Sequence, residues 1–359
     1  MNNVQQSVQQ SQSEPKAGLS AERLAHILER ITTVKAGVIG DACLDVYWES
    51  DMRYSELSRE TPHYTLPVRS ERYSPGAGSN VAANFKALGC AEVHVCSIVG
   101  DDWRGGLLKQ ALRDQGINDA YSVTAADWCT PAYCKPIRIG LQGVRQEDAR
   151  LDFQNYEPPS EATTQQFIER LDAMAAEVDV IAVTDQFTHG VIGEAARDRL
   201  RHWAQLGKTI LVDSRSRIRQ FDGIIVKPNE LEALNSYGLE PDAAQDLPFW
   251  HELARRLAAD SNAPCMMTLG GGGSIWASGG DSVWVPSLPV SEPIDIVGAG
   301  DSFASGILAA LGAGCSGEEA MRFAHYVSGV TIRKLGTTGT ASPAEIRRLH
   351  QQAVEGTNA

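Results

Sequence analysis

A glycine-rich turn is joined to a carboxylate near the C-terminal end of the chain, in the stretch Asp295-Ile296-Val297-Gly298-Ala299-Gly300-Asp301. The small, apolar residues 302–311 that follow it predict a helix. The first free N–H groups of such a helix attract anions, phosphate above all. Asp301 would be a poor phosphate ligand, because like charges repel, and it is suited to take a proton from an attacking hydroxyl. The alternative is that Asp301 only caps the helix.

Length, charge and cysteine content limit the class of protein. The chain has 359 residues, which is enough for one large α/β domain or two smaller ones, and its 43% hydrophobic and 21% charged residues are ordinary for a soluble globular protein. The net charge of −13 argues against nucleic acid as the main partner, although a phosphorylated small molecule needs only a local cationic pocket. No run reaches transmembrane length and no signal pattern begins the chain, so we expect no membrane partner and a cytoplasmic location. The seven cysteines form no Cys-x-x-Cys pair, which predicts buried thiols and no zinc site.

Apolar runs alternate with helical stretches after a polar tail at residues 1–18, for which we expect disorder. Ser20 can cap a first helix that extends to about Ile31. Buried strands are predicted at 36–40, 95–99, 180–183, 209–212, 224–226 and 265–269. Helices are predicted at 80–89, 103–115, 161–176, 190–206 and 248–259. This alternation predicts one α/β domain at residues 19–350, with a mostly parallel sheet covered on both faces and ligands at the carboxyl ends of its strands.

Two extended segments break the alternation, at residues 61–73 and 131–155. They contain strand-like residues without helices between them, which predicts a small antiparallel sheet that projects from the domain as a lid. A lid would serve phosphoryl transfer by excluding water, which otherwise competes as the acceptor. The alternative is an ordinary β edge of the core.

Five polar or glycine-rich segments follow predicted strands. They are residues 40–45, 75–80, 227–232, 268–273 and 295–301. Each one alone is common in α/β proteins, but their order and spacing together are much more specific.

In these segments the chain resembles the ribokinase (PfkB) family of carbohydrate kinases, over roughly residues 35–345. Residues 295–301 are similar to the C-terminal signature of that family, residues 76–80 to its glycine signature, and Asn229-x-x-Glu232 to its Asn-x-x-Glu motif. Within the family the likeness is closest to the bacterial D-glycero-β-D-manno-heptose 7-phosphate kinases. Three stretches carry that likeness, at residues 40–48, 150–153 and 334–340. The resemblance implies a ribokinase-like three-layer sandwich with a mostly parallel central sheet and a small β lid.

The resemblance assigns phosphoryl transfer to the end of the glycine turn. Asp301 would be the base that deprotonates the sugar hydroxyl, and an ordinary Asp titrates near about 4, so it is ionised at neutral pH. The N–H groups of Gly298, Ala299 and Gly300 would form the anion hole for the transferring phosphoryl group.

Nucleotide and magnesium contacts follow from the same resemblance. Asn229 and Glu232 would hold Mg²⁺ through water, since Mg²⁺ keeps much of its hydration shell. Thr268 and Gly270 would contact the phosphates of ATP, and the run that ends at Gly273 would let them approach.

The sugar and adenine contacts complete the implied site. Asp45 and Asn80 would hydrogen-bond sugar hydroxyls, beside Gly76 and Gly78 of the glycine signature. His325 lies where the family lines its adenine pocket; the alternative is a helix histidine satisfied within the protein.

Family members often bind a monovalent cation such as K⁺ beside the anion hole. Asp295 and the carbonyl of Val297 would be its ligands here. Hydroxyl-bearing residues are common at the two positions that Ile296 and Val297 occupy in this chain, but backbone carbonyls can still serve.

The chain departs from the heptose kinases at the acceptor. It has Glu-Leu-Ser-Arg-Glu-Thr-Pro at residues 56–62 and Asp-Ser-Arg-Ser at 213–216, where those kinases have Arg-Ile-Ser-Pro-Glu-Ala-Pro and Asp-Pro-Lys-Gly. Arg215 could replace the lysine as a phosphate ligand, although the two cations differ in geometry. Further cationic candidates come from the lid: Lys135, Arg138 and Arg150. The alternative for each is a solvated charge.

The main expectation is an ATP-dependent sugar kinase, acting on the anomeric hydroxyl of a heptose 7-phosphate. A kinase for another sugar, polyol or nucleoside stays open, as does a non-catalytic binder on the same fold, although Asp301, Asn229 and Glu232 argue against a binder. A dinucleotide-dependent oxidoreductase fits poorly, because residues 76–80 open no Gly-x-Gly-x-x-Gly pattern. Exposed lid edges favour a homodimer.

Overall fold

The computed structural model describes residues 18–242, 244–336 and 338–357, so the tail expected at residues 1–18 lies outside it except for Gly18. In this part of the chain the main sheet has eight strands, in the order β15-β14-β13-β12-β11-β10-β1-β4. Their bounds are β1 Lys35–Gly40, β4 Glu92–Cys96, β10 Val180–Asp185, β11 Thr209–Ser214, β12 Ile225–Val226, β13 Cys265–Thr268, β14 Ser274–Ser278 and β15 Asp281–Val285. Neighbours from β4 to β13 pair in parallel, and β14 and β15 pair antiparallel.

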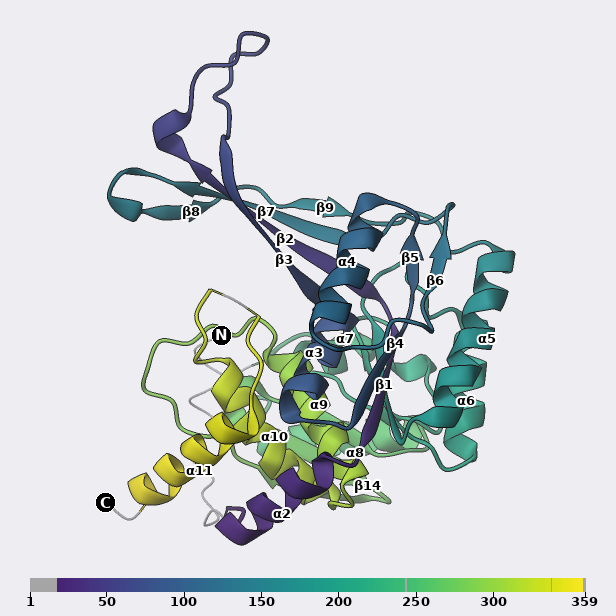
Figure 1. Ribbon diagram of the computed structural model, residues 1–359. Helices are drawn as coiled ribbons and strands as arrows, with labels where there is room; N and C mark the ends of the chain where they lie inside the picture. The colour runs from purple at the N-terminus through teal and green to yellow at the C-terminus, as the bar shows by residue number, and fades with distance from the viewer. Residues whose placement is uncertain (1–17, 243, 337, 358–359) are drawn as a thin grey trace.

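Helices cover both faces of this sheet, as Figure 1 shows. The bounds are α2 Ala21–Ile31, α3 Gly78–Leu88, α4 Trp103–Asp114, α5 Glu161–Glu177, α6 Glu194–Gln205, α7 Glu230–Ser236, α8 Leu247–Asp260, α9 Ala299–Gly312, α10 Gly317–Thr331 and α11 Pro343–Thr357. Side chains alternate along the buried strands: Val38 and Ala182 belong to one apolar cluster with α2, α3, α9 and α10, whereas Ile39 and Val183 belong to a second cluster with α5 to α8. The predicted three-layer ribokinase-like fold is therefore confirmed.

The predicted elements agree with the structure, with differences at their ends. The apolar run 95–99, predicted as one strand, is interrupted at Ser97, so that it supplies the end of β4 and the start of β5, Ile98–Gly100. β5 leaves the main sheet and pairs in parallel with β6, Val123–Ala125. Ser20 caps α2 as predicted, accepting a hydrogen bond from the Arg23 N–H at 3.1 Å. None of the helices in the described ranges is long and apolar enough to cross a membrane.

A second sheet projects from the main one and forms the lid (Figure 1). Its strands run in the order β3-β2-β7-β8, with β9 also paired to β7. Their bounds are β2 Ala42–Asp51, β3 Val68–Ala77, β7 Ala132–Ile139, β8 Arg145–Glu147 and β9 Leu151–Phe153. Strand β2 was not predicted, because its burial on both sides removes the alternation that marks a half-exposed strand. β2 also pairs in parallel with β7, so the sheet is mixed, whereas we had predicted an antiparallel one.

The segment between β2 and β3, residues 52–67, extends away from the body as an arm (Figure 1). The expected lid segment 61–73 therefore includes part of this arm and only the first half of β3. The arm folds back on itself through a bridge between Leu57 and Tyr64, which are 60% and 69% exposed. The arm is thus held mainly by its own backbone hydrogen bonds, and its apolar side chains face solvent.

Candidate active site

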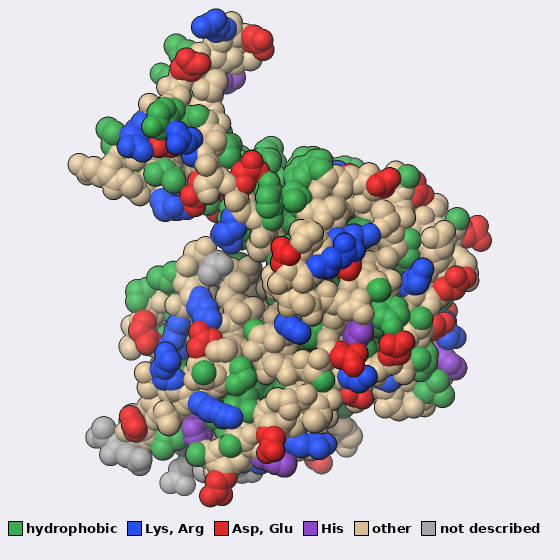
Figure 2. Space-filling model, in the orientation of Figure 1, with side chains coloured by type: hydrophobic (Ala, Val, Ile, Leu, Met, Phe, Trp, Pro, Cys, Tyr) green, Lys and Arg blue, Asp and Glu red, His purple; other side chains and the backbone are tan. Residues whose placement is uncertain are grey.

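A cavity of about 280 Å³ lies where the carboxyl ends of the main strands face the lid. Figure 2 shows the surface hollowed between the lid and the body. The residues that line the cavity are Asp45, Gly76, Ala77, Asn80, Tyr133, Lys135, Arg150, Gln186, Arg215, Val297, Gly298, Gly300, Asp301 and Thr338. Most of the predicted base, anion-hole and acceptor residues are therefore brought together. The predicted nucleotide and magnesium residues, by contrast, lie beyond this lining, whereas Val297, a predicted K⁺ ligand, is part of it.

Asp301 stands in the first turn of α9, whose N-cap is Gly298 at φ 79°. Its carboxylate accepts a hydrogen bond from Asn80 Nδ2 at 2.7 Å, across 221 positions of sequence. Burial raises the pKa of Asp301 to about 6, although the hydrogen bond from Asn80 acts in the other direction. The N-cap position belongs to Gly298, so the alternative that Asp301 is the helix cap does not fit the structure. A carboxylate that titrates near neutral pH beside free helix N–H groups is suited to accept a proton.

The glycine signature brings Asn80 to this carboxylate through a tight turn into α3. A Cβ on Gly76 would lie 3.0 Å from Asp45 Oδ1, and one on Gly78 would lie 2.3 Å from Thr184 Oγ1. Neither position therefore accepts a side chain without moving a neighbour. Ala77 between them has φ 48°, a conformation that costs a residue with a side chain on the order of 1 kcal/mol. Asn80, predicted as a sugar ligand, thus holds the carboxylate of the predicted base in place.

Lys227 lies beside the predicted anion hole, although the sequence predicted no role for it. It is 3% exposed and its Nζ lies 2.7 Å from Asp213 Oδ2. Burial alone would lower the pKa of Lys227, but Asp213, and then Glu232 and Asp301, outweigh burial and raise it. A Cβ built on Gly300 would lie 3.9 Å from the ammonium, which places a fixed positive charge beside the predicted anion hole. A lysine directly after the apolar strand residues 224–226 was the available signal.

The predicted magnesium residues form a capping box at the start of α7. Asn229 Oδ1 accepts from the Glu232 N–H, and Glu232 Oε2 accepts from the Asn229 N–H, both at 2.8 Å. One oxygen of Glu232 is left over, and burial raises the pKa of this carboxyl, with Asp213 adding to the effect. Across the described residues, no group of three His, Cys, Asp or Glu side chains is placed to ligate a metal directly. The donor set fits a hydrated Mg²⁺ contacted through its waters.

The glycine run after β13 lies beside this capping box, since Asn229 and Thr268 form a parallel bridge. Gly270 begins a short 3-10 turn, and Gly273 ends it at φ 100°. A Cβ on Gly273 would lie 2.3 Å from the Val285 carbonyl, so this position requires glycine. Thr268 and Gly270 thus lie at the carboxyl end of β13, next to the predicted magnesium residues.

His325 on α10 is 7% exposed and is satisfied within the protein. Its Nε2 lies 2.9 Å from Ser274 Oγ, and its ring meets the edge of Phe303 with centroids 5.0 Å apart. Burial lowers the pKa of His325 to about 4, so the ring is neutral at pH 7. This environment favours the structural alternative over a direct adenine contact.

Asp295 connects two loops beside the anion hole. Its carboxylate accepts from the Val297 N–H at 3.0 Å and from the Gly336 N–H at 2.9 Å. Thr338, from the same C-terminal loop as Gly336, lines the cavity, and a Cβ on Gly298 would lie 3.6 Å from its methyl carbon. The predicted cation residues Asp295 and Val297 therefore lie together, next to the predicted anion hole.

Three cationic side chains surround the acceptor side of the cavity. Lys135 Nζ lies 3.5 Å from Asp45 Oδ2, and Arg150 stacks over the Tyr133 ring with its guanidinium carbon 4.2 Å from the centroid. Arg215 is exposed to solvent and lines the same cavity. Arg138, the fourth cationic candidate, is paired with Asp148, as Arg150 is with Asp152, but unlike Arg150 it does not line the cavity.

Comparisons with known proteins agree with this geometry. A family model described as "pfkB family carbohydrate kinase" matches residues 38–345. Two similar curated proteins, both named "Bifunctional protein HldE", come from Citrifermentans bemidjiense, at 31% identity over 329 residues, and Trichlorobacter lovleyi, at 30% over 339 residues. Each match covers 89% of this chain, and the chain spans 63% of the length of each relative.

Solved structures with the same fold include sugar kinases. Phosphofructokinase-2 from Escherichia coli in complex with potassium matches with a TM-score of 0.69 at 19% identity, covering 90% of this chain and 100% of that one. Ribokinase from Arabidopsis thaliana, complexed with ribose and ATP, matches with a TM-score of 0.64 at 18% identity, covering 88% and 98%.

Proposed function

Since the chain belongs to the pfkB family of carbohydrate kinases, and is therefore a phosphotransferase that acts on a sugar hydroxyl, we propose that its acceptor is D-glycero-β-D-manno-heptose 7-phosphate. The reaction would place the γ-phosphate of ATP on the anomeric hydroxyl. The sequence resemblance to the heptose kinases at residues 40–48, 150–153 and 334–340 supports this acceptor. The observation that carries a phosphorylated acceptor is the set of three cations that share one cavity with Asp301: Lys135, Arg150 and Arg215.

Asp301 and the start of α9 perform the transfer. The carboxylate takes the proton of the anomeric hydroxyl while that oxygen forms a bond to the γ-phosphorus, and the bond to the bridging oxygen of ADP breaks. The N–H groups of Gly298, Ala299 and Gly300 receive the negative charge of the transferring group, with Lys227 beside them. Asn80 orients the carboxylate through its 2.7 Å hydrogen bond.

The two ends of the acceptor are held by different residues. Asp45, only 4% exposed, accepts hydrogen bonds from sugar hydroxyls at the end near Asp301. Arg150 and Arg215 hold the phosphate at the far end. Hydrogen bonds between a guanidinium and a phosphate are charge-assisted and therefore stronger than neutral ones. Lys135 lies beside Asp45, and its ammonium donates to the hydroxyl of Tyr47 at 3.1 Å.

The nucleotide is held by the loops at the carboxyl ends of β12 and β13. Thr268, Gly270 and Gly273 contact the ATP phosphates, with His325 of α10 behind this loop. Asn229 and Glu232 would contact the waters of Mg²⁺, which would neutralise phosphate charge when bound. Asp295 and the Val297 carbonyl would hold K⁺ beside the proposed anion hole.

An acceptor screen tests the proposal. Purified protein with ATP and Mg²⁺ is offered heptose 7-phosphate, fructose 6-phosphate, ribose, free heptose and a nucleoside, with ADP release and phosphorus NMR of the product as readouts. Heptose 7-phosphate should give the highest kcat/KM, and its product should carry a second phosphate on the anomeric carbon. Turnover with unphosphorylated acceptors alone would refute the sugar-phosphate assignment and favour a polyol or nucleoside kinase.

A homodimer formed through the lid and arm, and a cytoplasmic location, are part of this proposal. Tyr54, Leu57 and Tyr64 of the arm are 56–69% exposed, and a second lid would cover such side chains. Sedimentation equilibrium of the wild type and of Leu57→Asp measures the dimer. The requirement for ATP and the seven cysteines without a disulfide bond support a cytoplasmic location.

A further inference from the structure

A buried carboxylate organises the loop between β10 and α6, residues 186–193, which is called the β10–α6 loop below. Asp41, 2% exposed, accepts hydrogen bonds from the backbone N–H groups of Gln186, Phe187 and Val191, at 2.7, 2.8 and 2.9 Å. Gly190 packs directly on the carboxylate, where a Cβ would lie 2.4 Å from Asp41 Oδ1. The loop is therefore wrapped around one side chain from the end of β1.

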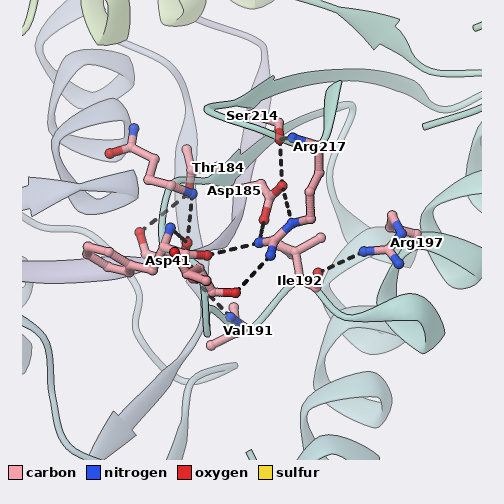
Figure 3. A network of polar contacts seen from close by, with 11 residues as sticks. Asp41, Thr184, Asp185, Val191, Ile192, Arg197, Ser214 and Arg217 are labelled. Carbon is pink, nitrogen blue, oxygen red and sulfur yellow. Dashed lines mark hydrogen bonds and ion pairs between the residues drawn. The ribbon is translucent and has the colours of Figure 1, made fainter. Parts of the chain in front are cut away.

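A half-buried arginine holds the carbonyl groups of the same loop. Arg217 donates to the carbonyl of Phe187 at 2.9 Å and to that of Thr188 at 2.8 Å. Its guanidinium is fixed by the fully buried carboxylate of Asp185, which also accepts from Ser214 Oγ at 2.6 Å. Figure 3 shows Asp41 and Arg217 converging on this one loop. Asp41 thus binds N–H groups of the loop and Arg217 binds its carbonyl groups, so the loop backbone is fixed by hydrogen bonds of both kinds.

The loop presents one polar side chain to the acceptor cavity. Gln186, its first residue, is part of the cavity lining together with Asp45, Lys135 and Arg215. Phe187, the next residue, meets the ring of Tyr133 on β7 edge-on, with centroids 6.3 Å apart. Tyr133 in turn lies under Arg150. The loop therefore touches both the cavity and the lid side chain on which a cationic residue is stacked.

We propose that Gln186 is a specificity-determining residue that hydrogen-bonds acceptor hydroxyls, and that Asp41 and Arg217 are positioning residues that aim it. The inference rests on the proposed function, since it needs an acceptor in this cavity. A neutral amide can both donate and accept, which suits a polyol, and it adds no charge beside an acceptor phosphate. Glutamine carries several rotatable bonds, so a fixed backbone on both sides of it limits where its amide can reach.

Gln186→Ala tests the contact directly. It should raise KM for the acceptor about 3- to 10-fold, as expected for one neutral hydrogen bond, and leave KM for ATP unchanged. Gln186→Glu should raise the acceptor KM further when the acceptor is phosphorylated, because like charges repel. Thr188→Ala, an exposed position in the same loop outside the cavity lining, is the matched control and should behave as wild type. An acceptor KM that Gln186→Ala leaves unchanged would overturn the proposal.

Arg217→Lys tests the positioning role, because lysine keeps the charge but cannot bond two carbonyls and Asp185 together. It should raise the acceptor KM with little effect on KM for ATP, and the matched control Arg199→Lys, which loses a comparable pair with Asp172, should not. A lower melting temperature with unchanged KM values would make Arg217 merely structural and overturn its assigned role. If no sugar phosphate is turned over by the wild type, the proposed function has failed; if one is, and the Gln186 variants match wild type, only this inference has failed.

Discussion

The two sides of the cavity are built in different ways. The phosphoryl-transfer side consists of backbone N–H groups and of side chains at the ends of core elements, such as the half-buried Asp301 on α9 and the buried Lys227 after β12. The acceptor side consists of longer side chains on the lid and on loops, such as Arg150 and Arg215, both of them more exposed. The first side is fixed by the fold, whereas the second can change its chemistry without disturbing the core. We therefore expect variants on the first side to affect turnover, and variants on the second to affect the choice of acceptor.

The largest effect should come from Asp301→Asn. The amide keeps the shape but cannot take the proton, so kcat should fall by about 10²–10⁴-fold. ATP binding, measured by calorimetry, should remain close to that of the wild type. Wild-type turnover in this variant would show that Asp301 is not the base. It would also contradict the expectation that variants on the phosphoryl-transfer side affect turnover.

Arg215→Ala should act on the acceptor side alone. Loss of a charge-assisted hydrogen bond costs about 1.5–3 kcal/mol, which raises KM for a phosphorylated acceptor by roughly 10- to 150-fold and leaves KM for ATP nearly unchanged. Arg138→Ala is the matched control, because Arg138 belongs to the lid but is paired with Asp148 outside the cavity. Steady-state kinetics with varied acceptor measures both variants. Equal KM values for Arg215→Ala and wild type would make Arg215 a solvated charge.

The titration of Asp301 should be visible in the pH dependence of both activity and stability. Because the pKa of Asp301 is raised to about 6 in the unliganded protein, kcat/KM should fall as pH drops through 6, by about 10-fold at pH 5. The stability of the fold changes with pH in the opposite direction. Because the pKa of Asp301 is about 6 in the folded protein and about 4 in the unfolded chain, its contribution to the free energy of unfolding is fully present below pH 4 and is lost as the pH rises through 6. Asp301→Asn should therefore melt above wild type at pH 7 and lose that advantage at pH 4. Identical melting curves at both pH values would contradict the raised pKa.

Glu232→Gln should have a smaller effect, on Mg²⁺ alone. Glutamine keeps the capping box with Asn229, so α7 should remain folded, but one anionic partner is lost and the Mg²⁺ concentration for half-maximal rate should rise several-fold. Glu319→Gln is a matched control, since Glu319 occupies the same position of another capping box, on α10. An Mg²⁺ titration that does not shift in Glu232→Gln would remove Glu232 from the metal site.

The part of the site that the sequence predicted is the part encoded by short local motifs. Residues 295–301 and Asn229-x-x-Glu232 could be found from the sequence because each motif lies in one short segment at the start of a helix, so that its residues are close both in the chain and in the structure. The pairing of Asn80 with Asp301 joins positions 221 residues apart, and no local pattern contains it. Gln186 and Tyr133 were missed for the same reason, because only the fold brings them to one cavity.

The predicted fold was accurate where strands are apolar and flanked by helices, as at β10 and β11. It was less accurate at β2, which is buried on both sides and follows β1 after one residue, Asp41, so that no turn marks its start. The arm also escaped prediction, since residues 52–67 carry strand-like residues but make their contacts mainly with one another.

Six of the seven thiols are buried, and Cys129 is half-buried. Burial raises the pKa of Cys90 to about 12 and also raises that of Cys129, so these thiols are protonated at neutral pH and react slowly with alkylating reagents. The chain therefore offers a nearly silent background for site-specific labelling. A cysteine introduced at the exposed position of Glu60 in the arm would react selectively with a maleimide dye, and its fluorescence could follow the arm as acceptor and nucleotide are added.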